Sequence, residues 1–230
     1  MNAPLAPALA LFSHLPLSER FHVHARAFSA PLEAVASRVP AGGRVADVGC
    51  GHGLLSALLA LGDSRRIVHG VDPDPRKIEW ARSGVGRLPN VRAEVGTVES
   101  LAEQHAGQFD AVVVSDVLYL LPVERWPGFL REARRLLRPG GRLLLKEAEG
   151  DRSWKHFKCL AQEVVMVKLL GRTKAGGALV LQPREAMRAL LREAGFTPRE
   201  TVELGVGYST PHILYVAEAT AGDGTADSAP

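Results

Sequence analysis

The sequence contains only two cysteines, Cys50 and Cys159, and no pair at C-x-x-C spacing. Two thiols are too few for the disulfide framework of a small secreted protein. No run of histidines and cysteines has the spacing of zinc ligands. The sequence therefore predicts neither a disulfide scaffold nor a metal site.

Long apolar runs are also missing, although hydrophobic residues make up 46% of the chain. A helix that crosses a membrane needs about 20 consecutive apolar residues, and no stretch approaches that length. The N-terminal stretch MNAPLAPALALF lacks the basic start and the long apolar centre of a signal peptide. We expect no membrane span and a cytoplasmic location.

The sequence has no large excess of charge of either sign. The 28 lysines and arginines nearly balance the 25 acidic residues, which leaves a formal net charge of +3. A nucleic-acid-binding protein shows a dense basic stripe instead, so we expect no nucleic acid as a partner. The 230 residues suit one domain with one sizeable core. We place that domain at residues 1–219 and a disordered tail at 220–230.

The most informative stretch runs from Arg44 to Gly62 and reads as a strand, a glycine turn and a leucine-rich helix. Its turn holds Gly49, Gly51 and Gly53, whose spacing suits a sharp bend and the close approach of a ligand. No lysine follows them, which excludes a Walker loop. Asp47 would repel a pyrophosphate at this helix start, so the ligand is predicted to be cationic here.

A second acid follows a second apolar strand. Asp72 stands at the C-terminal end of the strand 67–71 and 19 residues after Gly53 (72 minus 53). This spacing is typical of the acid that receives ribose hydroxyls in nucleoside-binding units. Asp74 is expected to cap the next helix, Arg76 to Arg82. A third strand is expected at 91–95.

The stretch from Asp47 to Gly53, DVGCGHG, resembles the first motif of class I S-adenosylmethionine-dependent methyltransferases. The stretch 115–122, after the strand 109–115, resembles the fourth-strand motif of that family. A helix at 124–137, an Arg-Pro-Gly-Gly turn and another strand form a further signature. The resemblance implies an α/β, Rossmann-like fold, with a seven-stranded mostly parallel sheet, an antiparallel last strand and helices on both faces.

The resemblance also implies S-adenosyl-L-methionine as the cofactor. Thr97 stands where the family more often has an acid, and the fourth strand lacks the Asn/Asp-Pro-Pro-Tyr motif of base methyltransferases. The residues expected to bind the cofactor are Asp47, Gly49, Cys50, Gly51, Gly53, Asp72, Pro73, Thr97, Val98, Ser115 and Asp116.

Two segments are expected to form a small helical lid, residues 11–39 and 150–182. The first carries His14, His22, His24 and Arg26 beside apolar residues, and Ser29 is expected to cap a helix that runs to about Val39. The second contains an amphipathic stretch at 154–170.

We predict methyl transfer to a small or medium-sized, partly apolar metabolite, with a hydroxyl or carboxyl group as first choice. Tyr119, Glu147 and His156 are the catalytic candidates at the acceptor side. Alternatives are C- or N-methylation of a lipid, isoprenoid or natural-product acceptor, and a non-catalytic cofactor-binding regulator. An NAD(P)-dependent oxidoreductase is disfavoured by Asp47 and by the absence of a Tyr-x-x-x-Lys motif. The sequence leaves the acceptor and the oligomeric state open.

Overall fold

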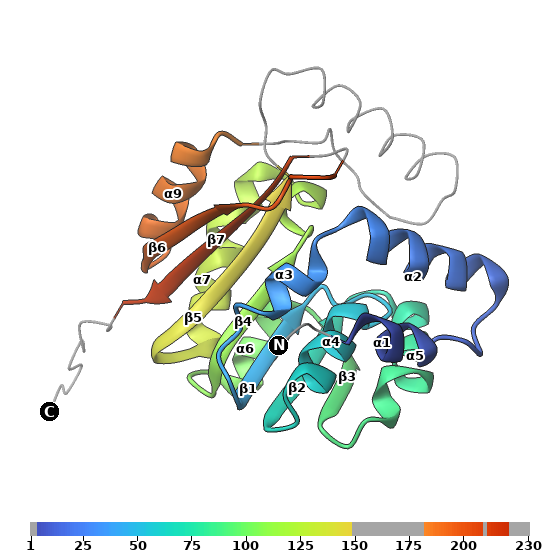
Figure 1. Cartoon of the computed structure of the whole chain (residues 1–230). Helices are drawn as coiled ribbons and strands as arrows, with labels where there is room; N and C mark the ends of the chain where they lie inside the picture. The colour runs from blue at the N-terminus through green and yellow to red at the C-terminus, as the bar shows by residue number, and fades with distance from the viewer. Residues whose placement is uncertain (1–3, 149–181, 209–210, 221–230) are drawn as a thin grey trace, which may run out of the picture.

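The computed structural model describes residues 4–148, 182–208 and 211–220. It contains a seven-stranded sheet in the order β3-β2-β1-β4-β5-β7-β6 (Figure 1). The strands are β1 (Gly43–Val48), β2 (Arg66–Asp72), β3 (Val91–Val95), β4 (Phe109–Ser115), β5 (Leu137–Ala148), β6 (Phe196–Glu203) and β7 (His212–Ala219). Strand β7 runs antiparallel to both of its neighbours, β5 and β6. The predicted mostly parallel sheet with an antiparallel last strand is therefore confirmed.

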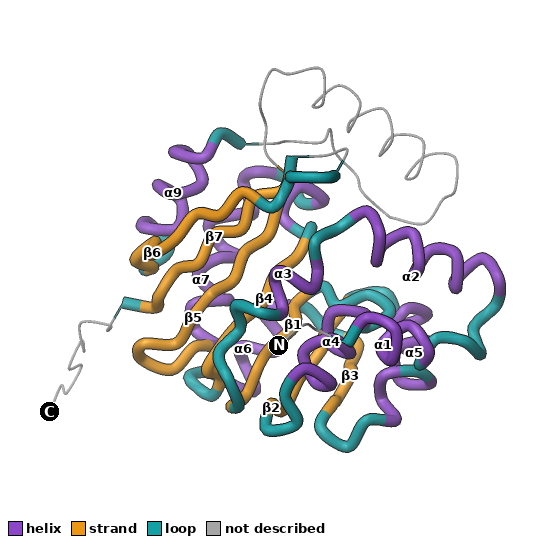
Figure 2. The backbone as a smooth tube through the Cα atoms, in the orientation of Figure 1, coloured by secondary structure: helices purple, strands orange, loops and turns teal. Residues whose placement is uncertain are grey.

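Helices cover both faces of the sheet, as the purple segments on either side of the orange strands show (Figure 2). One face carries α1 (Leu5–Ala10), α2 (Leu17–Ser29), α3 (Leu32–Ala36), α4 (Leu54–Gly62) and α5 (Pro75–Ser83). The other carries α6 (Val98–His105), α7 (Trp126–Leu136) and α9 (Arg184–Glu193). Among the described residues, no helix combines the length and the apolar character that crossing a membrane requires.

The central strands are apolar on both faces because helices cover both. In β4, Val112 and Val114 pack with α6 and α7, whereas Val113 packs with the N-terminal helices. All three are fully buried. Helix α4 is also nearly all apolar, and its residues from Leu54 to Ala60 are all buried.

The helix predicted from Ser29 to Val39 is wrong in its start. Ser29 is the last residue of α2, and the next helix, α3, begins at Leu32 after Pro31. Asp74 does cap α5, because its Oδ1 accepts the N–H of Arg76 at 3.0 Å. The predicted lid segment 150–182 and the tail 220–230 lie almost entirely outside the described residues.

Candidate cofactor and acceptor site

The site lies where the parallel strands end. The carboxyl ends of β2, β1, β4 and β5 meet along one edge, since these four strands are neighbours in the sheet and run the same way. Asp72 ends β2, the glycine loop follows β1, Ser115 ends β4, and Glu147 lies near the end of β5. Ligands of open α/β sheets bind at this edge.

The three glycines of the loop after β1 all have positive φ angles, of 77°, 56° and 86°. A Cβ atom at Gly49 would lie 2.4 Å from Val117, and one at Gly53 would lie 2.6 Å from Val85. A Cβ atom at Gly51 would meet no heavy atom within 4 Å. Packing therefore requires glycine at the first and third positions, whereas Gly51 borders open space that a ligand can enter.

Asp72 holds this loop from the neighbouring strand and is 6% exposed. Its Oδ2 accepts the N–H of Gly51 at 2.9 Å, and its Oδ1 accepts the N–H of Asp74 at 2.9 Å. An ionised carboxylate has about four acceptor directions, so these two bonds leave one at each oxygen. That arrangement suits two vicinal hydroxyls of a ribose.

Asp47 lies deeper, on β1, and is 2% exposed. The hydroxyl of Ser56 donates to its Oδ2 at 2.6 Å. Burial raises the pKa of Asp47 to about 6, and the charge of Asp72 adds to the effect. A nearby cation would stabilise the ionised form. The open space at Gly51, Asp72 and Asp47 together suit S-adenosylmethionine, which carries a ribose, a sulfonium and an ammonium group.

The remaining cofactor candidates differ in their surroundings. Cys50 is half-buried, burial raises the pKa of its thiol, and Pro73 is exposed. Thr97 is exposed and caps α6, with its hydroxyl oxygen accepting the N–H of Ser100 at 3.3 Å. Val98 is buried in the core. The Thr97 hydroxyl thus already caps the helix.

A charged cluster lies at the end of β4. The Nζ of Lys146 donates to both carboxylate oxygens of Asp116, at 2.5 and 2.6 Å, and Arg26 from α2 lies 2.7 Å from Oδ2. Burial alone would raise the pKa of Asp116, but the charges of Arg26 and Lys146 outweigh it and hold that pKa below its usual range. Ser115, next to Asp116, is 8% exposed, and its carbonyl accepts from Arg26 at 3.2 Å.

Glu147 ties β5 to the turn after β4. Its Oε1 accepts the N–H groups of Val117 and Leu118, at 3.1 and 2.9 Å. Burial, followed by the charge of Asp116, raises the pKa of Glu147 to about 8. Leu118 begins the 3-10 helix η2 (Leu118–Leu120), which contains the half-buried Tyr119. Two catalytic candidates therefore come from adjoining elements, while the third, His156, lies outside the described residues.

Helix α2 contacts this edge at two points. Glu19 Oε2 lies 2.9 Å from Nε2 of His52 in the glycine loop, and Arg26 reaches the end of β4. Arg26 stood out in the sequence only as one of several polar residues near the N-terminus. Lys146 was missed, although a lysine after three leucines in a predicted strand is an unusual signal.

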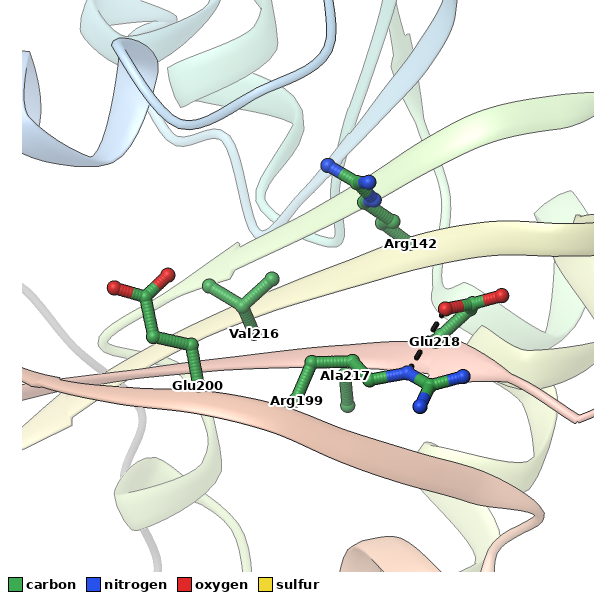
Figure 3. Close-up of a pocket in the computed structure, with 6 residues that line it drawn as sticks. All are labelled: Arg142, Arg199, Glu200, Val216, Ala217 and Glu218. Carbon is green, nitrogen blue, oxygen red and sulfur yellow. Dashed lines mark hydrogen bonds and ion pairs between the residues drawn. The ribbon is translucent and has the colours of Figure 1, made fainter.

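Two further observations concern a second hollow and the possibility of a metal site. An open hollow of about 490 Å³ lies toward the opposite end of the sheet, where Arg199 pairs with Glu218 at 2.9 Å (Figure 3). It is lined by residues of β5, β6 and β7 and by none of the glycine loop, namely Arg142, Arg199, Glu200, Val216, Ala217 and Glu218. Within the described ranges, no three His, Cys, Asp or Glu side chains are grouped so that they would hold a metal ion.

Comparisons with known proteins agree with this geometry. A family model described as a methyltransferase domain matches residues 45–141. The chain is similar to a ubiquinone biosynthesis O-methyltransferase of Xanthomonas axonopodis pv. citri, with 41% identity over 120 residues, which are 50% of this chain and 47% of that protein. The matched part thus spans about half the length of that relative.

Two other similarities extend over more of the chain. A ubiquinone biosynthesis O-methyltransferase of Aromatoleum aromaticum is 31% identical over 182 residues, covering 76% of this chain and 72% of that protein. The structure of the Burkholderia thailandensis 1,6-didemethyltoxoflavin-N1-methyltransferase matches with a TM-score of 0.67 at 19% identity, over 96% of this chain and 92% of that one. The chain belongs to the class I S-adenosylmethionine-dependent methyltransferase family.

Proposed function

We propose that this protein transfers the methyl group of S-adenosylmethionine to an oxygen atom of a small or medium-sized, partly apolar acceptor. The observation that carries the proposal is the open space at Gly51 beside the buried carboxylate of Asp72. Relatives named ubiquinone biosynthesis O-methyltransferase support oxygen as the methylated atom. When bound, the cofactor supplies an electrophilic methyl group on a sulfonium.

The protein chiefly positions the two reactants and shields them from water. Asp72 receives the ribose hydroxyls, Asp47 faces the ammonium end, and the backbone at Gly51 lies against the cofactor. Fixing two reactants in line removes much of the entropic part of the barrier, and excluding water strengthens the electrostatic contacts. Helix α2, within the predicted lid segment 11–39, contributes Arg26 and Glu19 to the cover of this edge.

The acceptor side is assigned to the end of β4 and β5, with Tyr119 and Glu147 as candidates. Glu147 Oε2 accepts no hydrogen bond from the described residues, although the carboxyl group is buried. With a pKa of about 8 the group is mainly protonated at neutral pH and donates to an acceptor oxygen. His156 remains a candidate base on a segment outside the described residues.

The test is to incubate the purified protein with methyl-labelled S-adenosylmethionine and a panel of phenols, carboxylic acids and amines. Mass spectrometry then locates the methyl group. We expect O-methylated product from the wild type and little from Asp72→Ala at a cofactor concentration near the wild-type Kd. A product methylated on nitrogen or carbon would replace the proposed acceptor atom. If the protein binds the cofactor but methylates nothing in the panel or in cell extract, the alternative of a non-catalytic cofactor-binding regulator would be favoured.

A further inference from the structure

The glycine loop after β1 is held in its first half by β2. The carbonyl oxygen of Val71 accepts the N–H groups of Gly49 and Cys50, at 2.8 and 3.0 Å. Asp72, the next residue of β2, accepts the N–H of Gly51 at 2.9 Å. These three hydrogen bonds fix the loop as far as Gly51, the position that borders open space.

The second half of the loop contacts helix α2. His52 is 7% exposed, and its Nε2 lies 2.9 Å from Oε2 of Glu19. An ionised carboxylate can only accept, so Nε2 carries a ring proton and is the donor. The ring of His22, one turn further along α2, has its centroid 5.3 Å from that of His52. Two side chains of α2 thus lie against the imidazole of the loop.

The hydrogen bond to Glu19 forms whether or not His52 is charged. Burial lowers the pKa of His52, and the hydrogen bond to Glu19 opposes that shift. Three more groups face the ring: His22 on α2, Lys77 on α5, whose charge also lowers this pKa, and Asp72 on β2, whose charge raises it. Nε2 carries a proton in the imidazolium as well as in this neutral tautomer. The donor is therefore present on either side of the pKa.

Helix α2 lies across two neighbouring strand ends. Glu19 and Arg26 are seven residues apart, which is about 10 Å and two turns, so both project from the same side of the helix. Glu19 reaches the loop after β1 and Arg26 reaches the end of β4, and these two strands are neighbours in the sheet. The buried residues of α2 are Val23 and Ala27, neither of them large. So small an apolar contact leaves the polar contacts to determine how α2 and the loop fit together.

Glycine gives this loop its conformational freedom. Gly51 and Gly53 flank His52 and have φ angles of 56° and 86°, which glycine adopts about as readily as negative ones. Without contacts that select one conformation, such a loop populates several in the free protein. A loop that is ordered before binding costs the ligand no free energy of ordering. Holding His52 therefore favours the binding of a ligand at the adjacent Gly51.

We propose that Glu19 is a positioning residue for the cofactor. By holding His52 it keeps the glycine loop in the conformation in which Gly51 faces S-adenosylmethionine. The inference rests on the proposed function and adds to its site a residue that acts through another. A contact that served merely to attach α2 would change the stability of the fold and leave the affinity for the cofactor unchanged.

Substitutions of Glu19 test the proposal by calorimetry with S-adenosylhomocysteine. Glu19→Ala removes the acceptor for His52, and we expect the Kd to rise about tenfold. Glu19→Gln keeps an oxygen that accepts from Nε2, so its Kd should stay within about threefold of the wild-type value. In the double variant Glu19→Ala/His52→Ala, the loss of affinity should not exceed that of His52→Ala alone. Losses that add, or a wild-type Kd in Glu19→Ala, overturn the inference.

Val23→Ala is the matched control. It loosens the packing of α2 by truncating a buried side chain and leaves Glu19 and His52 in place. It should lower the urea midpoint, while the Kd for S-adenosylhomocysteine should be unchanged. An equal rise of the Kd in Val23→Ala and Glu19→Ala would assign the effect to the attachment of α2 as a whole and overturn the inference.

A second measurement needs no ligand. The N–H groups of Gly51 and Gly53 are hydrogen-bonded, at 2.9 Å each, to Asp72 and to the carbonyl oxygen of Cys50. In the free protein, Glu19→Ala should speed hydrogen exchange of both amides by about tenfold or more, because the loop opens more often. Unchanged exchange overturns the inference. A wild-type protein that binds no S-adenosylhomocysteine overturns the proposed function instead, and the exchange rates still show whether Glu19 orders the loop.

Discussion

The ammonium group of Lys146 lies 2.5 and 2.6 Å from the two carboxylate oxygens of Asp116, and the lysine side chain is completely buried. Asp116 is also the one non-glycine residue with a positive φ angle, 59°, in the described part of the chain. The pair holds the turn after β4 in a backbone conformation that few side chains adopt. This is the turn that we propose faces the reacting groups.

Removing one partner of this pair should destabilise the fold. Breaking a buried ion pair costs about 3–5 kcal/mol because a buried charge is left uncompensated. We expect Lys146→Met to cost about 3 kcal/mol, near the lower end, since Arg26 still faces Asp116. Urea unfolding measures the loss. The matched control is Arg65→Met, which removes the exposed arginine of a 2.7 Å pair with Asp63 and should leave the midpoint nearly unchanged.

Lys146→Met combined with Asp116→Asn should recover part of that stability, because neither charge is then buried alone and asparagine tolerates a positive φ angle. A double variant no more stable than Lys146→Met would contradict this account of the pair.

The motifs that the sequence predicted are local. Asp47 lies one residue before the end of β1, the glycines follow that strand at once, and Asp72 ends β2, so a short stretch of sequence determines both the element and the position of the side chain. The same holds for the strands β3 and β4, whose predicted bounds agree with the structure. Parallel strands then bring these ends to one edge without further information.

Contacts between distant segments were beyond such reasoning. His212 and Ser29 are 183 positions apart in the chain, and Arg26 and Asp116 are 90 apart (116 minus 26). Ser29 illustrates the cost of a local rule, since serine before Pro31 suits a helix start but here ends α2. Thr97 shows a similar ambiguity, because a threonine that follows a strand can face a ligand or cap a helix.

Asp72→Ala should weaken the binding of S-adenosylhomocysteine about 30-fold, since the loss of buried, charged hydrogen bonds to two hydroxyls is worth about 2 kcal/mol. Calorimetry measures the affinity. Asp74→Ala is the control, because Asp74 is the adjacent acid and caps α5. It should cost about 1 kcal/mol of stability without changing the affinity. Wild-type affinity in Asp72→Ala would remove this carboxylate from the site.

Gly51 offers a test of the open space in the loop. Gly51→Ala adds a methyl group at a position with φ of 56° and no atom within 4 Å of the new Cβ. Gly107 has φ of 69° and equal room, in the connection between α6 and β4. Both substitutions should cost about 1–2 kcal/mol of stability through backbone strain. Only Gly51→Ala should also weaken the binding of S-adenosylhomocysteine, by tenfold or more. Equal affinities in the two variants would show that Gly51 does not face the ligand.

The ionised form of Asp47 should destabilise the fold at neutral pH, although it supports cofactor binding. Its pKa in the folded protein, about 6, lies above the ordinary value of 3.8, so the folded state holds this proton more tightly than the unfolded state. Stability is therefore lost as pH rises from about 4 to about 6, by up to about 3 kcal/mol for a shift of roughly two pKa units. Asp47→Asn should raise the free energy of unfolding by up to that amount at pH 7.5 and by about half of it at pH 5.

Asp47→Asn should also lower the affinity of the protein for its cofactor. In the proposed site the ionised Asp47 carboxylate faces the ammonium group of S-adenosylhomocysteine, so we expect binding to lower the pKa of Asp47 and to release its proton. Wild-type affinity should be constant above about pH 7 and fall by up to tenfold per pH unit below about pH 6. Asp47→Asn should bind weakly with no such slope. Fluorescence titration from pH 5 to pH 8 checks both, and a wild-type Kd that does not change over this range would show that Asp47 does not face the cation.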